Sequence, residues 1–323
     1  MPRLYDPSYP NGFIEVDHIN PYLMPNVPDI LVEPRATPFY RVPPMKFGNM
    51  PRDNGNLLLT PAERDELIKK NPRAEKWIRP FLGSKEFIRG IKRYCLWLVD
   101  CPPDELRKMP LVYERVKAVR EFRLKSKAAS TRKFADKPTL FCQIAQPKTD
   151  YLLVPRVSSE RRKYIPIGYI DANTIVTDSA FSVPDADLFL FGMLTSSVHM
   201  AWVKMVAGRL RMDYRYSNTI CYNCFPFPLF YTDERKRQVE LTAQKILDAR
   251  ANYPNASCAD LYDEVSMPYD LRKAHEANDL AVFNLYGRLK PDMDELTIQV
   301  ELLCMYRQLK DDFDALENVE EEF

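Results

Sequence analysis

The sequence predicts an α+β protein in which a domain with a mixed or antiparallel sheet precedes an all-helical C-terminal domain. A length of 323 residues corresponds to about two domains. Short runs rich in Tyr, Ile and Val, separated by polar turns, lie between residues 140 and 184, whereas only helical periodicity follows residue 232. Composition, charge and periodicity change together near residue 230. We therefore place the sheet domain at 24–230 and the helical domain at 231–323.

The first third of the chain begins with turn residues and then contains one clear helix start. Residues 1–56 are rich in Pro, Asn and Asp, which predicts an extended lead-in, and Leu57–Leu59 reads as a short strand. Thr60 is a good N-cap, and Glu63 three positions later completes a capping box, so a helix to about residue 70 is expected. The apolar run Tyr94–Val99 predicts a buried strand.

Residues 103–127 predict a short helix and then a longer one. Val112, Val116, Val119 and Phe122 recur at helical spacing, and the arginines and lysines between them are expected on the solvent side.

Strands are expected in the middle of the chain at residues 141–145, 151–154, 164–167 and 175–177. Asp185 or Asp187 can cap a long helix that runs to about Ala207. From Leu210 to Tyr216 apolar and charged residues alternate, which predicts one strand with three charged side chains on one face. The later helices are expected at residues 232–252, 258–265, 268–287 and 292–313.

The charge is unevenly distributed although the net charge is only +1. Residues 1–100 carry a net charge of +3, residues 101–230 of +8 and residues 231–323 of −10. A basic middle beside an acidic end is typical of a nucleic-acid surface. The alternative is a solvated helix with an acidic tail at Glu320–Glu322.

Several classes of protein are excluded by composition. The nine glycines form no G-x-G and no G-x-x-x-x-G-K, so neither common nucleotide-binding loop is present. No run of about 18 apolar residues predicts a membrane span, and the N-terminus does not resemble a secretory signal. Seven cysteines, an odd number, suggest free thiols in a reducing, cytoplasmic compartment.

Two motifs that could suggest chemistry are weak. Cys221 and Cys224 form a C-x-x-C, but no second pair or suitably spaced histidines complete a metal site, so we expect no metal. Ser196, Ser197 and His199 lie within one apolar helix, where hydroxyls bonding to preceding carbonyls are the simpler reading than a catalytic nucleophile and base.

Two basic segments are candidates for binding the phosphates of a nucleic acid. Hydroxyls, amides and positive charges that converge in one loop can hold a phosphate, although a solvated surface loop is the alternative for each segment. The first candidate set is Ser158, Ser159, Arg161, Arg162 and Lys163. The second is Lys125, Lys127, Arg132 and Lys133.

The strand around Arg211 and Asp213 has more specific chemistry. An arginine can donate two bonds to guanine O6 and N7, and an aspartate can accept from cytosine N4. Two residues apart on one strand face, the side chains would stand about 7 Å apart and could address a G·C pair. The alternative is a surface ion pair, which contributes little to stability.

A resemblance supports the nucleic-acid reading. The stretch Gly192–Ser217 and the run Tyr222–Pro228 resemble the target-recognition region of MmeI-like DNA adenine methyltransferases, the type IIL restriction–modification enzymes and their methylase relatives. The likeness spans about residues 18–290. Further matching stretches are Pro44–Asn49, Gly55–Pro61, Ile78–Pro80, Arg93–Asp100, Val157–Arg162, Leu261–Asp263 and Leu271–His275.

The resemblance implies which residues read the DNA bases. The family's strand readers correspond to Arg211, Asp213 and Arg215, and a second pair, found by an unbroken count over about fifty residues, corresponds to Arg156 and Asp178, with Ser179 beside it. The implied partner is double-stranded DNA, with at least one G·C pair in its site for each Arg–Asp pair.

The resemblance also implies what this chain lacks. In the family a preceding domain binds S-adenosylmethionine and carries an N-P-P-[YF] motif that clasps the flipped adenine for transfer to N6, and neither feature occurs here. Residues 1–23 then form a linker from a missing methyltransferase domain or subunit. The chain alone would hold no cofactor and would not methylate. The rival reading is a helical, acidic protein-interaction module that does not bind DNA.

Overall fold

Short strands build four small sheets in the part of the chain that the computed structural model describes, residues 1–5 and 10–320. Acidic-tail residues beyond 320 lie outside this part. In order across the sheets, the strands are β1 (Arg3–Tyr5) and β2 (Phe13–Glu15); β10 (Ile175–Val176), β5 (Ile78–Leu82), β6 (Tyr94–Leu96) and β4 (Leu58–Leu59); β3 (Lys46–Phe47), β11 (Ala180–Pro184), β7 (Tyr151–Pro155) and β9 (Gly168–Ile170); and β12 (Gly208–Leu210), β13 (Asp213–Arg215) and β8 (Val157–Ser158). All pairings within these sheets are antiparallel except the one between β10 and β5.

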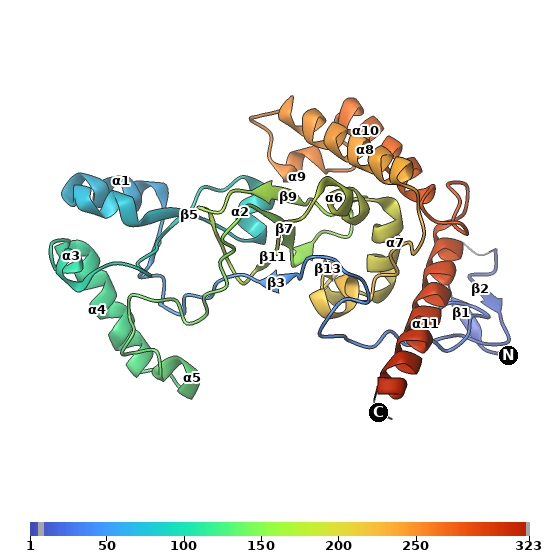
Figure 1. The fold of residues 1–323 in the computed structure, drawn as a ribbon, viewed down its shortest axis with the longest axis horizontal. Coiled ribbons are helices and arrows are strands. Elements are labelled where there is room, and N and C mark those ends of the chain that lie inside the picture. Colours follow the sequence, from blue (N-terminus) through green and yellow to red (C-terminus); the bar gives the residue numbers. More distant parts are fainter. Residues whose placement is uncertain (6–9, 321–323) are drawn as a thin grey trace.

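Helices flank these sheets and make up almost all regular structure after residue 232, as the sequence predicts (Figure 1). The helices before residue 231 are α1 (Pro61–Lys70), the 3₁₀ turn η1 (Pro72–Trp77), α2 (Ser84–Arg89), α3 (Pro103–Arg107), α4 (Pro110–Leu124), α5 (Ala129–Arg132), α6 (Leu188–Leu194), α7 (Ser197–Val206) and the π-helical turn η2 (Asn218–Tyr222). The later helices are α8 (Asp233–Ala251), α9 (Cys258–Leu261), α10 (Tyr269–Phe283) and α11 (Glu295–Glu320). The predicted α+β class is confirmed.

Both predicted helix starts have the expected caps. The Thr60 hydroxyl accepts a hydrogen bond from the Glu63 amide at 3.3 Å, and the Glu63 carboxylate accepts from the Thr60 amide at 2.8 Å. Of the two aspartates considered for α6, the N-cap is Asp187, whose carboxylate accepts from the Leu190 amide at 2.8 Å.

Two large apolar cores and one small cluster of Tyr151, Leu153, Val176 and Ala180 lie in the described part of the chain. The larger one joins the sheet around β7 and β11 to helices α6, α7, α8, α10 and α11, so the helical region shares a core with the sheet region. Gly192 on α6 permits this contact, because a Cβ there would lie 2.7 Å from a methyl group of Val239 on α8. A smaller core lies under α1, α3 and α4, in the lobe at the left of Figure 1.

Three expected elements before residue 208 differ from the structure. The long helix is broken into α6 and α7, because the Ser196 side chain caps a new helix there, accepting from the His199 amide. Residues 141–145 contribute only a single bridge between Gln143 and Met50. The run 164–167 is buried without strand pairing, in keeping with Pro166, which has no amide to donate; the strand begins at Gly168.

No single helix among the described residues is long and apolar enough to cross a membrane. The bent pair α6 and α7 has the length and composition of a span, but it packs in the larger core.

Candidate nucleic-acid interface

The predicted strand Leu210–Tyr216 is two strands joined by a tight turn. Leu210 at the end of β12 pairs with Asp213 at the start of β13, so Arg211 and Met212 form the turn between them. Arg211 has φ 58°, the sign that a type II′ hairpin turn requires at its first central position. The expectation that Arg211 shares a strand face with Asp213 is therefore wrong. Arg211 projects instead from an exposed hairpin tip.

On β13 itself, charged and apolar side chains alternate between the two faces of the strand, as the sequence predicts. Asp213 and Arg215 lie on one face of the strand, with Asp213 half-buried and Arg215 exposed, while Tyr214 between them is buried on the other face. The Arg209 guanidinium covers the Tyr214 ring at 4.0 Å. This packing anchors the hairpin and leaves the Asp213–Arg215 face uncovered by Tyr214.

The second Arg–Asp pair is also brought together, although its members are 22 positions apart. Arg156 Nη1 donates to the backbone carbonyl of Asp178 at 2.7 Å, and the Arg156 guanidinium lies 4.8 Å from the centre of the Phe47 ring. Because the contact uses the main chain of Asp178, this hydrogen bond does not occupy the Asp178 carboxylate. Pairing of β7 with β11 creates this proximity, since Pro155 lies opposite Ala180.

A serine on α2 fixes these residues from the side. The Ser84 hydroxyl accepts from the Arg156 amide at 2.9 Å and donates to the Ser179 carbonyl. The Ser84 amide donates to the Ser179 hydroxyl at 3.2 Å, and that hydroxyl also lies 2.6 Å from the Thr177 hydroxyl. Sequence reasoning missed Ser84, because nothing in its local pattern distinguishes it from an ordinary helix-start residue.

The two Arg–Asp pairs are carried by neighbouring backbone segments. Arg215 on β13 lies opposite Val157 on β8, and the Tyr216 amide donates to the Arg156 carbonyl at 2.8 Å. We call the set of Arg156, Asp178, Ser179, Arg211, Asp213 and Arg215 the Arg–Asp surface.

The first predicted phosphate segment adjoins this surface, but not all of its members are exposed. Arg161 and Lys163 are exposed and Ser159 is half-buried, whereas Ser158 is 3% exposed and its hydroxyl accepts from Arg162 at 3.5 Å. The Ser158 side chain therefore cannot serve as an exposed phosphate ligand. Loss of solvent lowers the pKa of Arg162, and the nearby Asp213 carboxylate acts in the opposite direction.

The second predicted phosphate segment is not brought to the Arg–Asp surface. Lys125, Lys127, Arg132 and Lys133 are all exposed at the end of α4 and around α5. Figure 1 shows α5 at the tip of the left lobe, well separated from β13.

His199, Ser196 and the two cysteines of the C-x-x-C motif are buried. His199 Nε2 lies 2.9 Å from the Tyr216 hydroxyl, and burial lowers the pKa of His199 to about 3, so the ring is neutral. The Ser196 hydroxyl donates to the Met193 carbonyl at 2.7 Å, which confirms the helix-bonding reading over a nucleophile–base pair. Cys221 and Cys224 are fully buried free thiols.

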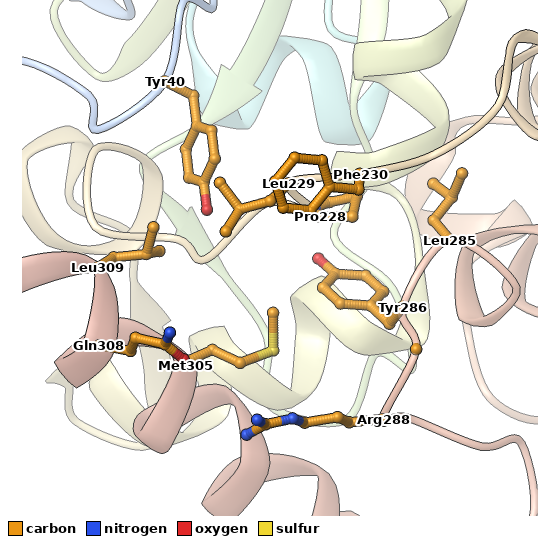
Figure 2. A pocket seen from close by; sticks show the side chains of 11 residues that line it. Tyr40, Pro228, Leu229, Phe230, Leu285, Tyr286, Arg288, Met305, Gln308 and Leu309 are labelled. Atoms are coloured by element: carbon orange, nitrogen blue, oxygen red, sulfur yellow. The ribbon is translucent and has the colours of Figure 1, made fainter. Parts of the chain in front are cut away.

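A mostly apolar opening lies elsewhere among the described residues. A cavity of 360 Å³ sits between the segment Pro228–Phe230, the Leu285–Arg288 turn and α11. Figure 2 shows Tyr40, Met305 and Tyr286 pointing into it, with Arg288 along one edge. Its lining contains none of the Arg–Asp surface, so it is not part of the candidate interface.

The fold and the site define a class of protein. The molecule presents a cationic surface with a hairpin and with arginines beside carboxylates, on small sheets followed by a helical C-terminal region. This combination is typical of a module that recognises the base sequence of a nucleic acid.

Comparison with known proteins identifies the family. The family model described as "MmeI, target recognition domain" matches residues 26–229, and "MmeI, C-terminal domain" matches residues 231–314. This chain belongs to the MmeI target-recognition family.

Two relatives illustrate the likeness. DNA methyltransferase A of Bacillus subtilis (strain 168) is 40% identical over 294 residues, covering 91% of this chain and 33% of the relative. The solved structure of the type IIL restriction–modification enzyme MmeI in complex with DNA is 42% identical with a TM-score of 0.89, covering 93% of this chain and 40% of that one. The chain thus spans about a third of the length of its curated relative.

Proposed function

We propose that this chain reads the base sequence of double-stranded DNA for a site-specific adenine-N6 methyltransferase of a restriction–modification system. The observation that carries the proposal is that two arginine–aspartate sets from distant parts of the chain are brought onto neighbouring backbone segments. S-adenosylmethionine binding, adenine flipping and methyl transfer belong in this proposal to a methyltransferase domain or subunit outside the chain, working in the cytoplasm. Residues 1–23 form the connection to it, 24–230 the reader and 231–323 its helical support.

The chemistry of the surface favours G·C pairs. Asp213 and Arg215 stand about 7 Å apart on one strand face, which suits an acceptor for cytosine N4 and a donor for guanine. Arg211 at the hairpin tip can reach deeper into the major groove than either. Arg156 with the Asp178 carboxylate forms the second such set.

Phosphate contacts place this surface on the duplex. Arg161, Lys163 and Ser159 lie beside the reading strands and serve this role in our proposal. The segment Lys125–Lys133 adds contacts only where one duplex spans both lobes. Because each phosphate contact releases counterions, binding is expected to weaken steeply with salt.

The test is a selection of duplexes from a random library by this chain, followed by mobility-shift titrations. Arg211→Ala is expected to lose about 1–3 kcal/mol on the selected site and to relax one base position, because a two-bond contact to guanine disappears. Lys245→Ala on the exposed side of α8 is the control, with no change expected.

Two results would contradict the proposal in different ways. Equal weakening of Arg211→Ala on every sequence would reduce Arg211 to a phosphate contact. Absence of DNA binding by the unmodified chain at low salt would favour the protein-interaction reading.

A further inference from the structure

A groove of 430 Å³ lies between helix α2 and the β8–β13 edge, next to the Arg–Asp surface. Lys85 and Arg89 of α2 line one wall, and Val157, Ser159, Arg162 and Asp213 line the other. Lys85 and Arg89 are four residues apart, so both project from the same face of the helix.

We propose that this groove holds one phosphate of the DNA backbone through Lys85, Arg89 and Arg162, and so fixes the register of the neighbouring base readers. The inference rests on the proposed function and adds two residues that neither the sequence motifs nor the family resemblance singles out.

The charge of the groove supports an anionic occupant. Three cationic side chains line it against the single carboxylate of Asp213. Neither Lys85, Arg89 nor Arg162 forms an ion pair with any residue in the described ranges 1–5 and 10–320. Converging like charges repel one another, and an anion between them removes that repulsion.

Arg162 adds an independent sign of a binding role. Its Nε atom is buried and has no hydrogen-bond acceptor among the described residues, although Nη1 bonds to Ser158. A buried guanidinium donor without an acceptor is unfavourable, and a phosphate oxygen is a strong acceptor for it. The groove therefore has a net positive charge, and one of the side chains that line it carries an unused donor.

The position of the groove explains why a phosphate there would matter. Ser84, immediately before Lys85, bonds to both Arg156 and Ser179 at one end of the Arg–Asp surface. Asp213 belongs to the other end and lines the groove itself. A phosphate held between the two sets would set the register of both on the duplex without carrying sequence information.

The experiment compares the unmodified chain with the double variant Lys85→Ala/Arg89→Ala on the duplex that the unmodified chain selects. Removal of one phosphate contact is expected to lower the slope of log K against log salt by about 0.9. The base preference in the selection is expected to stay the same. The double variant Arg235→Ala/Lys245→Ala on α8 removes the same charge at exposed positions and is the matched control.

A second arm locates the phosphate. Duplexes with single methylphosphonate linkages remove one negative charge at a time. At one linkage the neutral substitution should weaken binding by the unmodified chain but not by the double variant. Inorganic phosphate, titrated against the melting temperature of both proteins, tests whether the groove takes a free anion instead.

The outcomes separate this inference from the proposed function. No DNA binding by the unmodified chain would overturn both. Normal binding with the same salt slope and methylphosphonate profile in both proteins would overturn the groove alone. A changed base preference in the double variant would also overturn it, by making Lys85 and Arg89 base readers. A melting shift with millimolar phosphate only in the unmodified chain, together with the same salt slope and methylphosphonate profile in both proteins, would reassign the groove to a free anion.

Discussion

Replacing Arg123 with methionine is expected to destabilise the lobe that carries α4 and α5. The Arg123 side chain is fully buried, and no carboxylate among the described residues pairs with it. Its guanidinium donates instead to five backbone carbonyls, and burial lowers its pKa. The acceptors and distances are Pro51 at 2.9 Å, Arg52 at 3.1 Å, Phe134 at 3.1 Å, Lys137 at 2.9 Å and Leu140 at 2.6 Å.

The size of the effect follows from these bonds. A hydrogen bond from a charged donor contributes about 1.5–3 kcal/mol, and a buried carbonyl left without a donor costs about 1–3 kcal/mol. The costs of leaving five carbonyls without a donor do not simply add, because removing an unpaired buried charge offsets part of the lost free energy. We expect a net destabilisation by Arg123→Met of about 3–5 kcal/mol.

Urea unfolding followed by tryptophan fluorescence measures this effect, since Trp77 and Trp97 pack against the core of the same lobe. With a slope of about 2 kcal/mol per molar urea, the midpoint should fall by about 2 M. Arg120→Met makes the same chemical change at an exposed position of α4 and should shift stability by less than about 0.5 kcal/mol. Equal shifts for the two variants would refute the reasoning, because the buried carbonyl contacts would then contribute nothing.

Three further predictions concern single sites. Burial raises the pKa of Asp279, so its favourable contribution to stability is present below the ordinary pKa of 3.8 and is lost as pH rises through the pKa of the folded state. In melting curves from acidic to neutral pH, Asp279→Asn should lose this dependence, and an unchanged pH profile would contradict the prediction. Burial raises the pKa of Cys221 to about 12 and of Cys224 to about 11, so an alkylating reagent at neutral pH should modify neither thiol before denaturation, as checked by mass spectrometry. Thr60→Ala removes half of the α1 capping box and should cost about 1 kcal/mol in urea unfolding, whereas Thr60→Ser should restore most of it.

Local chemistry made much of the fold predictable from the sequence. The capping box at Thr60 was identifiable, and the cap of α6 could be narrowed to Asp185 or Asp187, because the required side chains lie within three residues of the groups they satisfy. The helices after residue 232 were equally clear from their periodicity. The break between α6 and α7 was not, because apolar residues continue on both sides and only the hydroxyl of Ser196 marks the new start.

Burial on α4 shows a second limit. Val112, Val116 and Val119 fall on the buried side as predicted, but the next member of that stripe is Arg123, and Phe122 is 37% exposed. Spacing alone points to position 123, yet residue type points to 122. Only the five carbonyls that converge from other loops make an arginine acceptable there.

The candidate site, too, was only partly predictable from the sequence. The alternation around β13 correctly placed Asp213 and Arg215 on one face, but a continuous strand and a tight hairpin give the same alternation when the turn lacks Gly or Asn. Lys85 and Arg89 escaped notice because their relation to Arg162 exists only in three dimensions.

The rigidity of the Arg–Asp surface has to come from outside its own strands. Strands of two or three residues supply too few ladder bonds to hold side chains in register. The helical region supplies the rest: Tyr164, which follows the basic loop, donates to buried Asp279 on α10 at 2.7 Å and stacks on His275 with ring centres 4.1 Å apart. Because Asp279 also accepts from the Ser197 amide at the start of α7, one carboxylate ties that loop to the helix that leads into β12. Loss of the Asp279 contacts should therefore loosen the basic loop and the hairpin together. The acidic helices thus help to position the interface, although their negative charge disfavours direct contact with DNA.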